Sequence, residues 1–324
     1  MSGSKIMGYG AALPSLKVTN DDLTRVMDTQ DTWIVERTGI MSRYFSEYEN
    51  TSDLGARAAQ VAILDSGIDP KQIDLILVAT ITPDSMMPST ACLIQAKLGL
   101  NDQKCMAFDV NAACSGFMIA LQTADAYLRC NLAHTALIIG AETLSKVLDF
   151  NDRGSAILFG DGAGALLIQQ DDQTKKMVHF AQSKGDLEEV LTNEVTPLNP
   201  SMNLQQTFKG YLRMKGQAVY RFAVSAVQDG IEQVLKERNY SINQIDWIVP
   251  HQANLRIIQH VAEKMGIEMS KFYTNLDEVG NTSSASIPIV LAKMHSEGIL
   301  KQGQKIILVG FGAGLTWASA LVEL

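Results

Sequence analysis

The sequence predicts an α/β protein built from two similar halves, and three observations lead to this prediction. Short apolar runs with the character of β-strands alternate with longer amphipathic segments, as in proteins that cover a sheet with helices. Three patterns of the first half recur in the second half at one shared offset of about 170 residues. The length of 324 residues and a hydrophobic content of 46% suit a globular chain with a sizeable core.

The apolar runs predict strands at residues 75–79, 105–110, 136–139, 165–168, 247–249, 305–309 and 318–322. The amphipathic segments predict helices at residues 54–66, 90–98, 114–129, 217–238, 255–265 and 287–297. The polar segment at residues 169–176 is the best candidate for a boundary between the halves. We therefore expect an N-terminal half over residues 1–172 and a C-terminal half over residues 173–324.

The repeat is carried by three pairs of segments, which are residues 73–78 and 245–250, 109–120 and 274–292, and 138–140 and 308–310. A single offset shared by three pairs is more than chance similarity between strands would usually give. The halves should therefore be related by a pseudo-twofold axis. Sites are expected where the halves meet, from strand ends and helix N-termini of both.

Charge and cysteine content exclude several classes of function. The net charge of −8 opposes nucleic-acid binding, because phosphate neutralisation needs a basic face. The first residues do not resemble a secretory signal, and no apolar run approaches the roughly 20 residues that span a bilayer. The four cysteines form neither a disulfide framework nor a CxxC zinc motif. We expect a soluble cytoplasmic protein with no metal site and no membrane insertion.

Cys114 is the cysteine whose surroundings suggest reactivity. A strand pattern at residues 106–110 runs into small residues, and a long amphipathic helix begins at or near Cys114. This arrangement places the sulfur at the positive end of a helix, where the thiolate is stabilised and its pKa falls. A free cysteine is more often a small core residue, which fits Cys92, Cys105 and Cys130. For Cys114 the local pattern leaves both interpretations open.

His251 and Asn281 are candidate partners from the second half. His251 follows the strand predicted at residues 247–249, at the end of a strand that faces the ligand crevice in α/β sheets. Asn281 lies in a run of small residues that enters a helix. It would serve either as a helix cap or as a neutral amide donor to developing negative charge, and spacing alone favours the cap.

Two glycine clusters, at residues 160–164 and 310–314, resemble nucleotide-binding turns only superficially. A dinucleotide fingerprint needs a strand, a glycine turn and then a helix. The first cluster precedes a predicted strand, and the second connects two predicted strands. We therefore reject NAD binding. The second cluster could instead present a backbone N–H to an oxyanion.

Taken together, these segments closely resemble the thiolase-like superfamily, and within it the beta-ketoacyl-[acyl-carrier-protein] synthase III family of bacterial type II fatty acid synthesis. The resemblance spans nearly the whole chain in seven ordered motifs: Asp28-Thr-Gln-Asp-Thr-Trp-Ile-Val-Glu-Arg-Thr-Gly-Ile, Asn111-Ala-Ala-Cys-Ser-Gly-Phe, Asp152-Arg-Gly, Phe159-Gly-Asp-Gly-Ala-Gly-Ala, Pro250-His-Gln-Ala-Asn-Leu-Arg, Gly280-Asn-Thr-Ser-Ser-Ala-Ser and Gly310-Phe-Gly-Ala-Gly-Leu-Thr-Trp. It implies a thiolase-like fold, with the duplicated halves in a layered αβαβα arrangement.

The resemblance also implies a reaction. Cys114 takes the acyl group of a short acyl-CoA, and backbone N–H groups of Cys114 and Ala313 hold the oxyanion. Malonyl-acyl-carrier-protein then loses CO2, and its carbanion attacks the acyl-cysteine. His251 and Asn281 stabilise the enolate as neutral donors, so neither a metal nor a cofactor is implied. Acyl-CoA and malonyl-acyl-carrier-protein are the substrates.

Further residues follow from the resemblance, position by position. The CoA site is Thr29, Trp33, Arg37, Arg153, Gly216, Tyr220 and Asn254, with Tyr220 standing where many relatives have phenylalanine. The acyl-carrier-protein site is Gln252, Ala253, Asn254, Leu255 and Arg256, with Arg221 and Lys264 as further candidates. The acyl pocket is Met87 and Phe311, and Met87 corresponds to a position that reaches across a homodimer. A flexible methionine there predicts tolerance of branched or longer primers.

Three alternatives stay open beside this interpretation. A related thiolase-like synthase would use another acyl primer or a CoA-linked extender. A cysteine hydrolase would also use a Cys-His-Asn set. A non-catalytic acyl- or carrier-binding protein is disfavoured, because the candidate nucleophile and both candidate donors are present.

Overall fold

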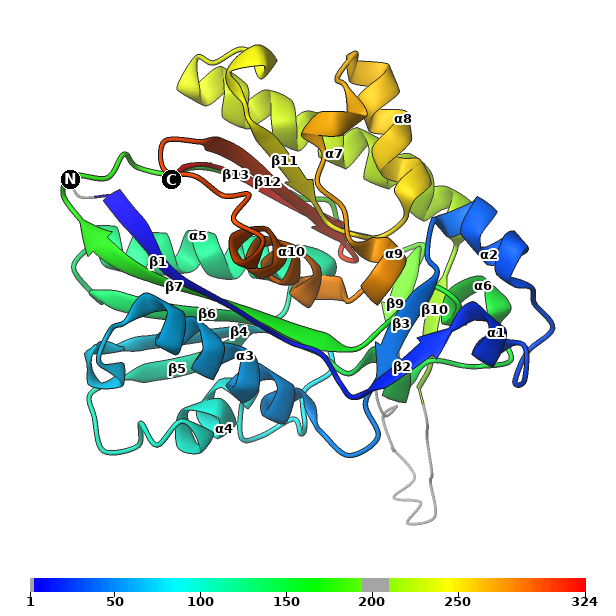
Figure 1. Cartoon of the computed structure of the whole chain (residues 1–324), viewed down its shortest axis with the longest axis horizontal. Coiled ribbons are helices and arrows are strands. Elements are labelled where there is room, and N and C mark those ends of the chain that lie inside the picture. Colours follow the sequence, from blue (N-terminus) through cyan, green and yellow to red (C-terminus); the bar gives the residue numbers. More distant parts are fainter. Residues whose placement is uncertain (1–2, 194–209) are drawn as a thin grey trace.

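The computed structural model describes residues 3–193 and 210–324, which form five layers of alternating helices and sheets (Figure 1). One outer layer contains α3 (Thr51–Ser66) and α4 (Thr90–Lys97). The opposite outer layer contains α7 (Gly216–Arg238) and α8 (Leu255–Met265). Between the two sheets lie α5 (Gly116–Arg129) and α10 (Ser286–Ser296). The predicted α/β class and its layered order are confirmed.

The first sheet has the order β1-β7-β6-β4-β5. Its strands are β1 (Gly3–Ala12), β4 (Leu75–Ala79), β5 (Met106–Val110), β6 (Thr135–Glu142) and β7 (Gly162–Asp171). Strands β4, β5 and β6 run parallel, while β7 is antiparallel to both β6 and β1. Strand β4 is fully buried because helices cover both of its faces, which explains its uninterrupted apolar sequence.

The second sheet repeats this arrangement with the order β11-β12-β13-β8. Its strands are β8 (Val178–Ser183), β11 (Trp247–Pro250), β12 (Lys305–Gly312) and β13 (Thr316–Glu323). Strand β11 is parallel to β12, and β13 is antiparallel to both β12 and β8, as in the β4, β6, β7 and β1 series. Strand β5 has no counterpart in the second sheet among the described residues.

The middle helices approach the sheets closely. A side chain at Gly140 of β6 would meet the backbone oxygen of Ser284 at 2.3 Å, and one at Gly164 of β7 would meet the backbone nitrogen of Ile289 at 2.5 Å. Glycine at these two positions therefore lets α10, from the second half of the chain, pack onto the first sheet. Helix α5 in turn packs against β12 and β13 of the second sheet. The halves thus share one middle layer.

The remaining elements gather at one end of the layers (Figure 1). They are β2 (Leu16–Thr19), β3 (Ser42–Phe45), β9 (Leu191–Asn193), β10 (Leu212–Met214), α1 (Asn20–Leu23), α2 (Asp31–Thr38), α6 (Arg153–Ala156) and α9 (Leu276–Val279). The sequence did not predict these short elements. It also missed β1 and β8, but all the strands and helices that it did predict are present within a few residues.

Candidate active site

Two short turns meet where the halves join. Cys114 lies in the 3₁₀ turn η2 (Ala113–Ser115) before α5, and η6 (Ser283–Ala285) precedes α10 in the same way. The two turns pack against each other. Ala113 and Ser283 both adopt a left-handed backbone, with φ of 47° and 50°, so the repeat extends to the conformation of the turns.

A single cavity of about 860 Å³ joins the candidate catalytic residues. Its lining contains Cys114 from the first half and His251, Asn281 and Gly312 from the second. It extends to the exposed side chains of Arg153, Arg221 and Arg256. The structure therefore brings together the three residues that the sequence singled out.

The end of β12 packs closely against the Cys114 turn. A side chain at Gly312 would meet the Cys114 backbone nitrogen at 2.6 Å, so only glycine permits this approach. The hydroxyls of Ser115 and Thr316 lie 2.7 Å apart and tie the two turns together. Ala313 lies in the same turn, but the cavity lining contains its neighbours Gly312 and Leu315 instead.

The expected lowering of the Cys114 pKa is not observed. Burial raises the pKa of this thiol to about 12, and the nearby Glu142 carboxyl contributes in the same direction. Both effects disfavour negative charge on sulfur. The Ser283 hydroxyl opposes them, and helix α5, which begins at Gly116, presents its positive end. Burial in this environment therefore favours the neutral thiol over the thiolate.

His251 is a buried neutral imidazole. It is 2% exposed, and burial lowers its pKa to about 3. Its Nδ1 lies 2.7 Å from Ser286 Oγ, which accepts a longer hydrogen bond from the Gln252 N–H at 3.5 Å. The Ser286 hydroxyl has no other acceptor among the described contacts, so we assign its proton to the bond with Nδ1 and the proton of the imidazole to Nε2. His251 can then donate a hydrogen bond from Nε2.

The Asn281 side chain forms a local hydrogen bond and keeps one polar group free. Its Oδ1 accepts a hydrogen bond from the Ser283 N–H at 2.9 Å, as a capping side chain does. Its backbone N–H donates to the Leu158 carbonyl at 2.8 Å, and its own carbonyl accepts from the Gly160 N–H at 3.0 Å. With Oδ1 engaged, the Nδ2 group remains as the donor for a ligand.

Trp33 forms an aromatic platform at the surface end of the cavity. The guanidinium groups of Arg37 and Arg153 lie 4.6 and 4.9 Å from its ring centroid. Asn254 donates from Nδ2 to the Arg37 carbonyl at 3.0 Å, which joins α2 to the start of α8. These four residues line the cavity together with Gly216 and Tyr220. Thr29 does not line it, and its buried hydroxyl has no partner among the described residues.

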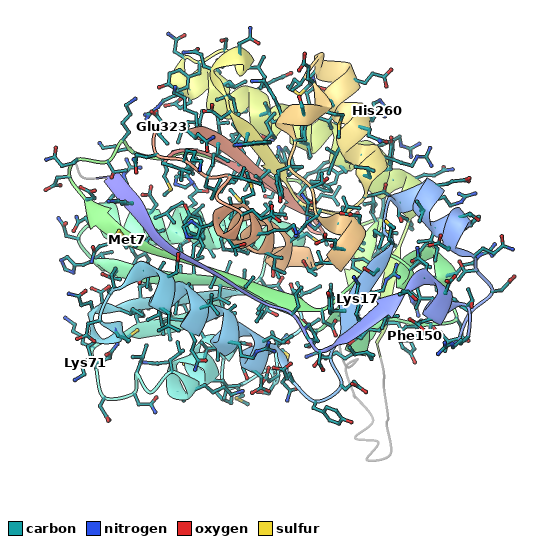
Figure 2. All side chains as sticks on the ribbon, in the orientation of Figure 1. Met7, Lys17, Lys71, Phe150, His260 and Glu323 are labelled. Carbon is teal, nitrogen blue, oxygen red and sulfur yellow. The ribbon has the colours of Figure 1, made fainter. Side chains whose placement is uncertain are left out.

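Positive side chains follow one face of α8. Arg256 and Lys264 are exposed two helical turns apart, with the exposed His260 between them (Figure 2). The Tyr220 hydroxyl lies 2.9 Å from His260 Nδ1, a contact that the sequence did not predict. Arg221 is also exposed and lies beside the cavity. Ala253 lines the cavity, and Leu255 is half-buried against Gly39.

Gln252 corrects the predicted carrier site. Its side chain is fully buried. Its Nε2 donates to the Pro250 carbonyl at 2.7 Å, and its Oε1 accepts from the Asn275 N–H at 3.1 Å. An enclosed and satisfied amide cannot contact a docked protein, so Gln252 supports the His251 loop instead.

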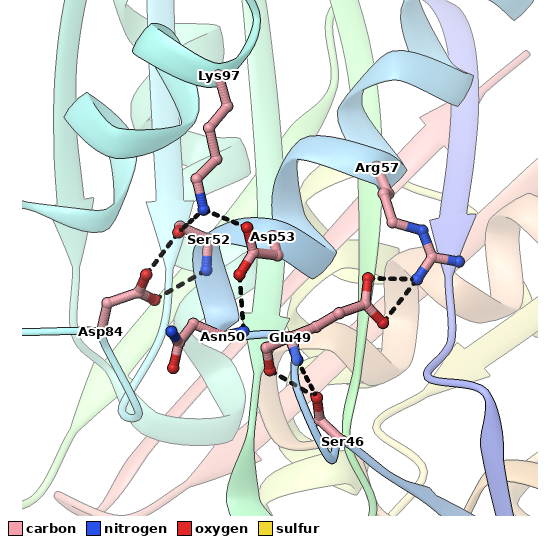
Figure 3. Close-up of polar contacts among 8 residues, drawn as sticks. All are labelled: Ser46, Glu49, Asn50, Ser52, Asp53, Arg57, Asp84 and Lys97. Carbon is pink, nitrogen blue, oxygen red and sulfur yellow. Dashed lines mark hydrogen bonds and ion pairs between the residues drawn. The ribbon is translucent and has the colours of Figure 1, made fainter.

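The two acyl-pocket residues lie in different places. Phe311 lines the cavity, and its ring contacts His251 edge-on with centroids 5.1 Å apart. Met87 is 85% exposed and does not line the cavity of its own chain. The loop before it is anchored, because the Ser52 N–H and hydroxyl both donate to Asp84, at 2.9 and 2.5 Å (Figure 3).

The sequence missed three buried polar residues at the junction, namely Glu142, Ser283 and Ser286. Glu142 could have been noticed as the lone charge that ends an apolar strand. The two serines lie in the small-residue run after Asn281, where the pattern alone does not distinguish one hydroxyl from another.

Within residues 3–193 and 210–324, no group of three or more His, Cys, Asp or Glu side chains is arranged to hold a metal ion. No helix in that same part of the chain could cross a membrane.

Comparison with known proteins finds family models, relatives and solved structures that are similar to this chain. A model of 3-oxoacyl-[acyl-carrier-protein] synthase III matches residues 108–185, and a model of the C-terminal region of this synthase matches residues 235–324. The beta-ketoacyl-[acyl-carrier-protein] synthases III of Clostridium beijerinckii and Clostridium acetobutylicum are 47% and 45% identical, over 100% of this chain and 100% and 99% of theirs. The crystal structure of the Aquifex aeolicus synthase III superposes with a TM-score of 0.92 at 38% identity, covering 99% of this chain and 100% of that chain. The predicted thiolase-like fold is confirmed.

Proposed function

The chain belongs to the 3-oxoacyl-[acyl-carrier-protein] synthase III family, and from this premise we propose that Cys114, His251 and Asn281 carry its reaction. The protein is an acyltransferase, an initiating condensing enzyme of fatty acid synthesis. One observation supports the residue assignment above the others: a buried thiol and two neutral donors line the same cavity. The alternative of a related synthase with another extender is not favoured, because the relatives matched over their full length are synthases III.

In the first step, Cys114 Sγ attacks the carbonyl carbon of an acyl-CoA. A carbon–sulfur bond to the enzyme forms, the bond to CoA breaks, and CoA leaves as its thiol, taking up the proton that Cys114 Sγ gives up. The negative carbonyl oxygen of the intermediate is held by backbone N–H groups, which we assign to Cys114 and Ala313. The close approach of Gly312 to the Cys114 nitrogen supports this assignment.

In the second step, malonyl-acyl-carrier-protein enters the same cavity and loses CO2. The electron pair of the broken bond is held as an enolate, whose oxygen accepts hydrogen bonds from His251 Nε2 and Asn281 Nδ2. The enolate carbon then attacks the acyl-cysteine, which releases 3-oxoacyl-carrier and the Cys114 thiolate. Neither the acylation step nor the condensation step needs a metal or a cofactor. Two neutral donors suit this step, because a positively charged group would stabilise the malonyl carboxylate and so oppose its loss as CO2.

Acyl-CoA would enter from the end of the cavity that holds Trp33. The adenine would stack on the Trp33 ring, with Arg153 beside it and Arg37 near the phosphates. Gly216, Tyr220 and Asn254 would line the pantetheine route. Thr29 would lie behind the residues that line this route, since its side chain is buried.

The carrier protein would dock on the positive face of α8. This docking surface consists of Arg256 and Lys264 together with Arg221 of α7, Ala253, Asn254 and Leu255. Its charge supports the assignment, because a chain of net charge −8 needs a local positive surface to meet an acidic partner.

Replacing Arg256 with glutamate should raise the apparent KM for malonyl-carrier by about tenfold, because the reversed charge repels an acidic partner. Acyl-CoA loading, measured separately by single-turnover acylation, should change little. Lys71→Glu is the matched control, since Lys71 is exposed on the opposite side of the molecule from α8 (Figure 2). Equal losses in both half-reactions would contradict docking at Arg256.

We further propose a homodimer that pairs through β5. Within the described residues β5 pairs only with β4, and its apolar side chains Met106, Phe108 and Val110 are partly or fully exposed. An uncovered apolar edge strand is a template for pairing with another chain. The N–H groups of Thr90 and Ala91 donate to Asp109 of β5 at 2.7 Å each, so the end of the loop that carries Met87 lies beside this edge.

On this proposal Met87 closes the acyl pocket of the partner subunit, and its flexible side chain should admit several primers. Isobutyryl-CoA and butyryl-CoA are expected to react with kcat/KM within about tenfold of acetyl-CoA. Met87→Phe should lower the value for isobutyryl-CoA more than that for acetyl-CoA. Met86→Phe alters the equally exposed neighbour and serves as the control. If the kcat/KM of wild type for acetyl-CoA exceeded that for the other two primers by orders of magnitude, the proposal that Met87 leaves the acyl pocket open to several primers would be wrong.

We also propose a role for each half of the chain and a cellular location for the enzyme. Residues 1–172 form the half that supplies the nucleophile, and residues 173–324 form the half that supplies both donors. The enzyme works in the cytoplasm, and four free cysteines, two of them exposed, support a reducing compartment.

The proposed reaction is tested by incubating the enzyme with acetyl-CoA and malonyl-acyl-carrier-protein. The expected products are 3-oxoacyl-carrier, CO2 and CoA. Release of free acetate without formation of a carrier product would instead indicate a hydrolase.

A further inference from the structure

The hydroxyl of Ser283 has no ordinary hydrogen-bond partner. The Ser283 side chain is buried, and its Oγ forms no hydrogen bond to any described residue. An unpartnered buried hydroxyl is unfavourable, so its presence calls for a physical reason. Ser283 also holds a left-handed backbone, with φ of 50°, in the turn that contacts the Cys114 turn.

The turn that holds this hydroxyl packs against the Cys114 turn. Hydrogen bonding by Ser283 opposes the rise in the pKa of the Cys114 thiol and also the rise in the pKa of the fully buried Glu142 carboxyl. The hydroxyl therefore has two groups within its reach, the nucleophile and a buried acid.

The Glu142 carboxyl has four donors besides Ser283. One oxygen accepts from the hydroxyls of Thr80 and Thr82 and from the N–H of Ile81, at 3.1, 2.6 and 3.1 Å. The other accepts from the Ser284 hydroxyl at 2.7 Å. A carboxylate offers about four acceptor sites, so Glu142 does not need the proton of Ser283. That proton is free to turn toward sulfur.

The repeat provides an internal comparison. In the first half, Ala113 occupies the turn position that Ser283 occupies in the second, with nearly the same φ of 47°. Ala113 shows that a methyl group fits this backbone conformation. The hydroxyl of Ser283 is therefore not required to form the turn, and a role in the chemistry of the neighbouring sulfur explains it better.

We propose that Ser283 is a further catalytic residue: its Oγ–H donates a hydrogen bond to the Cys114 sulfur whenever that sulfur is negatively charged. This inference rests on the proposed function of Cys114 as the acyl acceptor. The sulfur is negative twice in the reaction, as the attacking thiolate and as the thiolate released by condensation. In both states no bond to Ser283 forms or breaks, because the hydroxyl keeps its proton and only turns toward the charge. A hydrogen bond to a charged group stabilises it more than one to a neutral group.

Ser283→Ala tests this role in the full-length enzyme. Alkylation of Cys114 by iodoacetamide, followed by mass spectrometry of the Cys114 peptide, should be about 10- to 100-fold slower at each pH between about 6 and 9, as expected for loss of one charge-assisted hydrogen bond. Single-turnover acylation by labelled acetyl-CoA should slow by a similar factor. Decarboxylation of malonyl-carrier, which depends on His251 and Asn281, should stay within about threefold of wild type and report an intact fold.

The control is Thr282→Val in the same turn. Thr282 Oγ1 is also buried and unpartnered among the described residues, but it is not one of the groups that act on the Cys114 sulfur. This variant should alkylate and acylate as wild type does. Ser283→Gly, which adopts a left-handed backbone freely, repeats the test if the alanine variant loses decarboxylation.

Unchanged alkylation and acylation in the Ser283 variants would overturn the inference, and so would an equal slowing in Thr282→Val. Failure of the proposed function would look different. Wild-type enzyme would then form no acyl-Cys114 with any acyl-CoA, while the alkylation comparison would still be measurable.

Discussion

Replacing Cys114 with alanine is expected to abolish acyl transfer from acyl-CoA, with a loss of at least about 10,000-fold, because the covalent intermediate can no longer form. Decarboxylation of malonyl-carrier should survive in the same variant. None of the contacts that hold His251 and Asn281 involves the Cys114 side chain: Ser286 and Val309 hold His251, and Leu158, Gly160 and Ser283 hold Asn281. Acyl transfer is measured by trapping labelled enzyme, and decarboxylation by release of labelled CO2.

Cys130→Ala provides the control for Cys114→Ala. Cys130 is a free cysteine that is exposed at the end of α5, away from the cavity lining. It should leave both activities unchanged. Acyl transfer that persists in Cys114→Ala would show that the nucleophile had been assigned to the wrong residue.

Removing either enolate donor is expected to give the opposite pattern. His251→Ala and Asn281→Ala should each lower the rate of decarboxylation and condensation by about 100- to 1,000-fold, the usual cost of one preorganised donor to a developing oxyanion. Acylation of Cys114 by acetyl-CoA should fall by much less, because neither donor is assigned to that oxyanion. Rapid-quench measurement of acyl-enzyme formation and of 3-oxoacyl-carrier formation separates the two steps.

Ser286→Ala extends this test to the proton on His251. Without the Ser286 hydroxyl, nothing among the described contacts fixes Nδ1 as the acceptor, so a smaller loss in decarboxylation is expected, again with acylation retained. If His251→Ala and Asn281→Ala reduced acylation as strongly as decarboxylation, their role as enolate donors would be wrong.

Apolar runs in the sequence predicted the buried strands, and the repeat pattern predicted that the two halves are similar. The buried strands β4, β6, β11 and β12 are uninterrupted apolar runs, and such runs are readily recognised. Strand β1 was missed because three glycines interrupt its apolar pattern. Strand β8 was missed because it is half-exposed and carries polar residues, so tertiary pairing with β13 decides its structure.

The site could be predicted only in part, for similar reasons. Cys114, His251 and Asn281 stand at the ends of recognisable strands or at the starts of helices, and the resemblance to a known family joined them. The direction of the Cys114 pKa shift was predicted wrongly, because the sequence indicates a nearby helix but not the complete burial of the sulfur. Gln252 was assigned to the carrier site through the resemblance, whereas its amide is used inside the protein. Ser283 and Glu142 meet Cys114 only in three dimensions.

The most direct test of the central claim is mass spectrometry of the intact wild-type enzyme after brief exposure to labelled acetyl-CoA, followed by peptide mapping. The predicted result is one acetyl group per chain on the peptide that contains Cys114, removed on addition of malonyl-carrier with formation of 3-oxoacyl-carrier. An unmodified Cys114, an adduct on another residue, or an adduct that hydrolyses to free acetate before malonyl-carrier is added would contradict it.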